Sequence, residues 1–148
     1  MNRSALLAAG AVCLTALTAA PAFADTPVPP TVTSCGPSGL QAGLSTRVCA
    51  EVTGTTVEFY GTVGLAGPPS PGSPAPAPKE LLTTLSVEVV GAGAPVTRQG
   101  PVVFTASALE VRGEAASAPC GSTVRAAFGV ASFPWAARPV VHEVTLGC

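Results

Sequence analysis

The last stretch of the chain, residues 120–148, most constrains the fold, because it has the pattern of one long β-hairpin with a cysteine at each open end. A register that places the two cysteines opposite each other also merges two apolar faces, since side chains alternate along a strand. The pairs it predicts are Cys120 with Cys148, Phe128 with Val140, Val124 with Val144, and Ala126 with His142. A shift by one residue would separate the apolar faces. The stretch therefore predicts an antiparallel sheet.

A second hairpin is predicted over residues 47–63. Gly54-Thr55 forms a two-residue turn with glycine first, as a type II′ turn requires. This register places Val52 opposite Val57 and Ala50 opposite Phe59, so the apolar faces coincide again.

The rest of the chain alternates between short strands and turns. Strands are expected around residue 32 and over residues 81–90, 96–98 and 102–108, with 109–112 continuing the last after a bend. Residues 35–45 are expected to form a glycine-rich loop, and residues 67–78, with six prolines, an exposed loop. About seven strands and no helix predict an all-β, two-sheet antiparallel β-sandwich, loosely immunoglobulin-like.

The first residues have the pattern of a secretory signal peptide. A short basic start, an apolar run over residues 5–17 and the small-x-small sequence Ala22-Phe23-Ala24 predict cleavage after Ala24. The bulky Val12 before Cys13 disfavours a lipid-attachment site. We expect residues 1–24 to be the signal peptide and residues 25–148 a single secreted domain.

Four cysteines follow the expected cleavage site: Cys35, Cys49, Cys120 and Cys148. An even number in an exported chain indicates disulfide bonds, and four cysteines allow three pairings. We favour Cys35–Cys49 and Cys120–Cys148, because each pair brackets a turn-prone segment. Alternation predicts that Cys49 looks outward with Arg47 and Glu51.

Composition excludes several classes of partner. Residues 25–148 hold six basic and eight acidic residues, with no basic run, so binding to nucleic acid and stable membrane insertion are not expected. The scarcity of Lys and Asn and the abundance of Ala, Gly and Pro indicate a bacterial genome rich in G and C.

The sequence offers little for catalysis, and we expect neither an enzyme nor a cofactor. His142 is the one histidine and is predicted to lie on the inner face opposite small Ala126, as a packing residue rather than a base. Glu51 and Glu58 are predicted to face each other, which suits glycoside hydrolysis, but a solvated pair relieved by Arg47 is the simpler interpretation. No metal-binding pattern is present.

One loop stands out as a possible binding site. Residues 133–139 combine Phe133, Trp135 and Arg138 with two prolines at the tip of the last hairpin. An aromatic residue and an arginine on a rigid loop are typical of a binding hot spot. The alternative is that Trp135 folds back and caps the core.

Two resemblances suggest other functions. The segment from Cys35 to Cys49, which begins CGPSG, resembles the first disulfide loop of the actinobacterial subtilisin-inhibitor family, although no reactive loop is visible around Cys120. The two-disulfide sandwich resembles, in architecture, the apoproteins of enediyne chromoproteins. We therefore expect a secreted, non-enzymatic domain with a binding or structural role, the alternatives being a protease inhibitor or a carrier of a small apolar ligand.

Overall fold

The computed structural model describes residues 29–68, 70–72, 74, 76–105 and 108–147. The expected signal peptide and Cys148 lie outside this part of the chain, which is all-β and contains no helix. Its strands are β1 (Thr31–Cys35), β2 (Gly39–Gln41), β3 (Leu44–Thr53), β4 (Thr56–Leu65), β5 (Lys79–Val89), β6 (Val96–Phe104), β7 (Leu109–Arg112), β8 (Ala116–Ser117), β9 (Thr123–Ala131) and β10 (Val140–Thr145).

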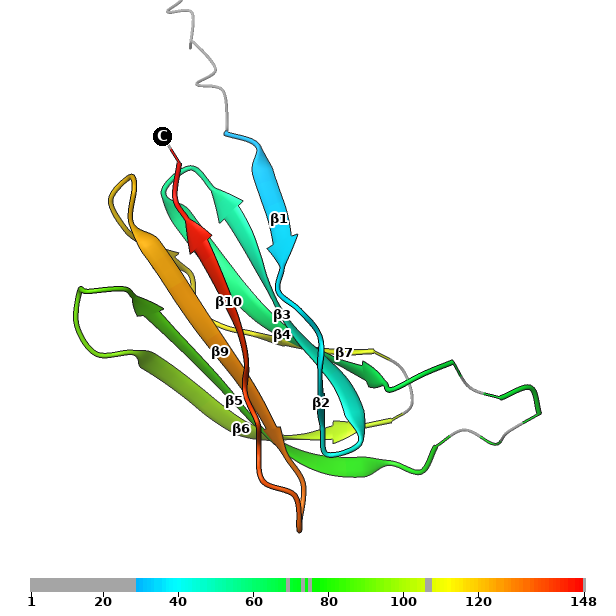
Figure 1. The fold of residues 1–148 in the computed structure, drawn as a ribbon. Coiled ribbons are helices and arrows are strands. Elements are labelled where there is room, and N and C mark those ends of the chain that lie inside the picture. Colours follow the sequence, from blue (N-terminus) through cyan, green and yellow to red (C-terminus); the bar gives the residue numbers. More distant parts are fainter. Residues whose placement is uncertain (1–28, 69, 73, 75, 106–107, 148) are drawn as a thin grey trace, which may run out of the picture.

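These strands form two antiparallel sheets (Figure 1). The six-stranded sheet has the order β1-β3-β4-β7, with β2 paired to β3 and β8 paired to β4. The four-stranded sheet has the order β10-β9-β5-β6. The arrangement agrees with the predicted β-sandwich.

The core lies between the sheets and takes residues from both. Phe59 of β4 and Phe128 of β9 are fully buried in one apolar cluster. Gly61 of β4 makes room for this packing, since a Cβ there would lie 2.4 Å from the Phe128 ring. A glycine in the middle of a strand is thus required by the close approach of the opposite sheet.

Both predicted hairpins are confirmed in register. In the last hairpin Val140 lies opposite Phe128, and His142 lies opposite Ala126. In the first, Val52 lies opposite Val57 across a turn whose Gly54 has a φ of 60°. The alternation of apolar residues was sufficient here because the large apolar side chains of each strand lie on one face, which packs on the core.

Three predictions outside the two hairpins are wrong. Residues 35–45 are not one loop, because β2 and the start of β3 form a tight hairpin there, with Ala42 and Gly43 at positive φ. β6 runs unbroken through Gly100-Pro101, because an edge strand needs hydrogen bonds on one side only and so tolerates a residue without an N–H. β7 does not continue β6, because it joins the other sheet beside β4, where Leu109 and Val111 pack on the core.

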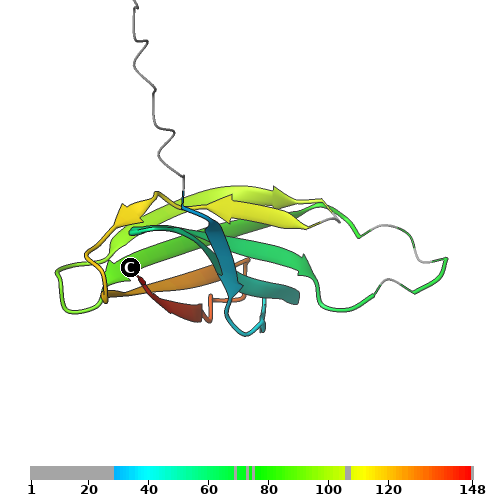
Figure 2. The ribbon, with the colours of Figure 1, turned by 90° about the horizontal axis from the view of Figure 1, so that it is seen from above.

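The proline-rich connection between β4 and β5 is a loop, as predicted. Its described residues from Ala66 to Pro78 are exposed and belong to no strand. This loop projects away from both sheets (Figure 2).

Candidate binding site at the hairpin tip

The loop that joins β9 to β10 begins with a tight turn. The backbone N–H of Ser132 donates to the carbonyl of Trp135 at 3.0 Å, and the N–H of Trp135 donates to the carbonyl of Ser132 at 2.6 Å. The Ser132 hydroxyl also donates to the backbone carbonyl of Glu80 at 2.9 Å. These bonds tie the turn to itself and to β5.

The aromatic side chains of this loop point into solvent. Phe133 is 99% exposed and Trp135 is 63% exposed. The alternative in which Trp135 caps the core therefore has no support in the geometry. Large apolar side chains held in water on a short loop are a common feature of binding surfaces.

A buried glutamine fixes the loop to the body of the protein. The Gln41 side chain is 3% exposed, and its amide nitrogen donates to the Thr46 hydroxyl at 2.8 Å and to the Phe128 carbonyl at 3.1 Å. Its amide oxygen accepts from the backbone N–H groups of Val130 and Arg138, both at 3.0 Å. One side chain of β2 thus holds both the end of β9 and the tip loop, with every hydrogen-bonding group satisfied.

The turn between β2 and β3 lies at the same end of the molecule as the tip loop (Figure 1). Ala42, in this turn, has a φ of 51°, and its carbonyl accepts a hydrogen bond from the Lys79 ammonium at the start of β5. A non-glycine residue rarely adopts this backbone conformation without support. The lysine therefore connects a third segment to the tip.

A hollow of about 660 Å³ lies between these three segments. Its lining comes from residues 40–43, Lys79 and residues 134–138. Leu40, at 69% exposed, and Trp135 supply the largest apolar surfaces, and Lys79 and Arg138 supply the charges. The volume suits a small organic ligand.

A second, more apolar cleft of about 340 Å³ lies at the edge of the sandwich formed by β6 and by residues 113–116. Leu85, Val87, Val89 and Val96 supply most of its aliphatic surface. The backbone at Gly113 passes close over the core, since a Cβ there would lie 3.0 Å from Leu85 Cδ2 and 3.1 Å from the Phe59 carbonyl. Charged residues of both signs, Glu88, Arg98 and Glu114, also line this cleft.

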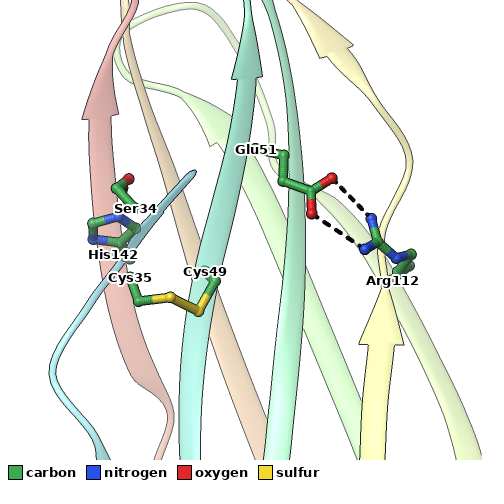
Figure 3. Close-up of a disulfide and its surroundings, with 6 residues drawn as sticks. All are labelled: Ser34, Cys35, Cys49, Glu51, Arg112 and His142. Carbon is green, nitrogen blue, oxygen red and sulfur yellow. Dashed lines mark hydrogen bonds and ion pairs between the residues drawn. A yellow bond between two sulfur atoms is a disulfide. The ribbon is translucent and has the colours of Figure 1, made fainter. Parts of the chain in front are cut away.

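His142 has a partner that the sequence did not reveal. Its Nε2 and the hydroxyl of Ser34 in β1 are 2.9 Å apart and hydrogen-bonded (Figure 3). Burial lowers the pKa of the His142 imidazole below its ordinary value. Among the described residues no carboxylate bonds to the other ring nitrogen, so the pair lacks the third member that orients a catalytic histidine. Its geometry fits a packed, half-buried histidine that links β1 to β10.

The two facing glutamates, Glu51 and Glu58, form ion pairs with one arginine. Glu51 and Glu58 lie opposite each other as predicted, but Arg112 of β7, and not Arg47, bridges them, at 3.2 Å and 3.1 Å. The hydrogen bonds that Arg112 donates to Glu51 and Glu58 raise the pKa of its guanidinium. Arg47 was the wrong choice because β7 was placed in the wrong sheet. Carboxylates held by an arginine on the outer face are not poised for glycoside hydrolysis.

The predicted Cys35–Cys49 disulfide is confirmed, whereas the predicted Cys120–Cys148 disulfide includes a residue outside the described part of the chain. Cys35 and Cys49 are bonded, with their Cα atoms 4.0 Å apart (Figure 3). Cys49 was expected to look outward with Arg47 and Glu51, yet it is only 3% exposed, because it lies between its disulfide partner Cys35 on β1 and Tyr60 on β4. The Cys120–Cys148 bond stays a prediction, since Cys148 is outside the described residues.

The described residues contain no group of three or more His, Cys, Asp or Glu side chains that could hold a metal ion. In the same part of the chain no helix is long and apolar enough to cross a membrane. Comparison with known proteins finds no matching family model, no matching curated protein and no matching solved structure.

Of the residues predicted for the binding loop, Trp135 and Arg138 line the hollow, while Phe133 stands beside it in solvent. Sequence reasoning missed Gln41 and Lys79, which complete the site. The sequence gives only weak evidence for them: Gln41 is the one amide side chain in a glycine-rich segment, and Lys79 is the one lysine of the chain. Only the folding of distant segments onto one end of the sandwich gives these two residues their roles.

Proposed function

We propose that this chain is an exported, non-enzymatic β-sandwich domain that binds a partner through the tip of its last hairpin. One observation carries the proposal: Phe133 and Trp135 are exposed on a loop that buried Gln41 holds in place. A loop fixed before binding loses less conformational entropy on binding than a mobile one. Loops on rigid β scaffolds are where binding residues concentrate.

Several finer features belong to the same proposal. Residues 1–24 act as a signal peptide that directs the chain to the bacterial cell exterior, and Cys120–Cys148 forms the second disulfide. The domain is immunoglobulin-like in the loose sense of a two-sheet sandwich with binding loops at its end. The confirmed Cys35–Cys49 bond supports an oxidising compartment.

The test is capture from the exterior fraction of the source organism by the immobilised exported protein. We expect the wild type and Val103→Ala, an exposed apolar change on β6, to retain the same partner. Trp135→Ala should lose it, with a free energy of binding weaker by about 2 kcal/mol. Equal retention by Trp135→Ala, with an unchanged melting temperature, would contradict the proposal.

A second candidate function is the carriage of a small apolar ligand. The observation that favours it is the aliphatic cleft between β6 and residues 113–116, with Leu85 beneath it. Its volume of about 340 Å³ is within the range of small-molecule sites. Extraction of the exported protein with organic solvent, followed by mass spectrometry, should recover a bound compound if this function is the correct one.

A further inference from the structure

The charges in the tip hollow have one sign. Lys79 and Arg138 are the ionisable residues among those that line it, and no carboxylate joins them. Glu80, next to Lys79, belongs to the opposite face of β5, because side chains alternate along a strand. The chain as a whole carries slightly more acidic than basic residues, so two cations on one hollow are a local feature.

Two arginines of the sheet faces, Arg112 and Arg125, are bound by acids, whereas Arg47 on β3 and Arg98 on β6 make no ion pair with the described residues. Arg112 contacts Glu51, Glu58 and Glu110. Arg125 contacts Glu88 and Glu143.

Arg138 differs from these two arginines. Its backbone N–H is bound to Gln41, but among the described residues no side chain accepts a hydrogen bond from its guanidinium. The backbone is therefore fixed while the charged end remains available. A guanidinium in this state can make strong, charge-assisted hydrogen bonds to a carboxylate.

The apolar side of the hollow adds a second requirement. Trp135 and Leu40 line it and are largely exposed, so each offers surface that a ligand would remove from water. A flat ring can stack on the indole while an acidic group reaches the cations. The two cations and the exposed apolar surface thus favour a molecule that has an acidic group beside a flat ring.

We propose that the tip hollow binds a small organic anion that carries a carboxylate beside an aromatic ring. Arg138 and Lys79 bind the carboxylate, and Trp135 contacts the ring. This inference rests on the proposed function, because it names the ligand class of the same tip.

The chain provides its own probe, because Trp135 is its single tryptophan. Its fluorescence is measured while 3-phenylpropanoate is added to the exported protein, and then while the neutral 3-phenylpropanol is added. We expect saturable binding of the acid and binding of the alcohol about tenfold weaker, because the charged hydrogen bonds are lost. Added salt should weaken binding of the acid and leave binding of the alcohol unchanged.

Variants place the binding at the hollow. Arg138→Gln should weaken binding of the acid about tenfold, and Arg47→Gln, the same change on the exposed face of β3, should not alter it. Amide chemical shifts should move at Gly43, Lys79 and Arg138 when the acid binds. Melting curves establish that each variant is folded.

Three results would overturn the inference: no saturable binding of the acid at millimolar concentration, equal binding of acid and alcohol, or wild-type binding by Arg138→Gln. Equal binding of both probes that disappears in Trp135→Ala would reject the anion and leave the tip as a binding surface. Retention of the captured exterior partner by Trp135→Ala would instead remove the tip from the proposed function.

Discussion

The tip hollow and the side cleft, which lies between β6 and residues 113–116, are two concave regions of the described residues, and different contacts hold their walls. The tip hollow is lined by two cations and an exposed indole, and a network of hydrogen bonds from Gln41 and Lys79 holds its walls. The side cleft is lined by aliphatic side chains together with Glu88, Arg98 and Glu114, and at Gly113 its backbone packs closely against Leu85.

The difference shows how a chain with few charged residues can build two kinds of concave surface. Hydrogen bonds have fixed directions and can hold a loop out in water, whereas apolar packing draws segments toward the core. A hollow held by hydrogen bonds is therefore suited to polar recognition. A cleft with closely packed aliphatic walls offers apolar contact to a guest.

The largest effect is expected at the centre of the hydrogen-bond network. Gln41→Leu leaves the N–H groups of Val130 and Arg138 without their acceptor and should lower the free energy of unfolding by about 3 kcal/mol. Gln99→Leu is the control, because Gln99 is exposed and donates only to the Thr84 hydroxyl. Urea unfolding measures the free energy of unfolding of both variants. Similar losses would contradict the view that the hydrogen bonds of Gln41 hold the tip hollow.

The next effect should come from the packed cleft. Gly113→Ala places a methyl group 3.0 Å from Leu85 Cδ2, and we expect a loss of about 2 kcal/mol from overpacking. Gly100→Ala is the matched control, since a Cβ there has no neighbour within 4 Å. If thermal unfolding finds the two variants equally stable, packing does not set the shape of the cleft.

Removal of the exposed indole should cost little stability. Trp135→Ala is expected to lower the free energy of unfolding by less than about 1 kcal/mol, because most of the side chain is already in water. Phe59→Ala, at a buried ring, should lose about 4 kcal/mol in the same urea experiment. A large loss for Trp135→Ala would mean that the indole supports the fold and that the tip is not a separate binding surface.

The smallest expected effect is the pH dependence of stability that His142 causes. The pKa of His142 is lowered by burial, so the unfolded chain binds its proton first as the pH falls below about 6.5. Stability should therefore decrease as the pH falls through this value. His142→Gln should flatten this slope in urea unfolding. His142 lines neither hollow, so a matching change in ligand binding at the tip would show that the sites are coupled.

Much of the fold was determined by the sequence alone. The alternation of apolar residues defined both hairpins and their registers. Every second residue of these strands packs on the core, and only one of two adjacent registers puts the apolar residues of both strands on the same face. The pairing of Cys35 with Cys49, the exposed proline-rich loop and two of the residues lining the tip hollow were also predictable. Each of these depends on neighbours along the chain.

The tertiary structure decided the rest, because it depends on segments that are distant in sequence. Arg112 replaces Arg47 between the two glutamates only because β7 pairs with β4. Gln41 and Lys79 reach the tip only because the sheets bring their strands to its side. Alternation along a strand predicts which face a side chain takes, but it does not predict which segment of the other sheet lies opposite. The contacts that build the tip hollow and the side cleft therefore could not be predicted from the local sequence.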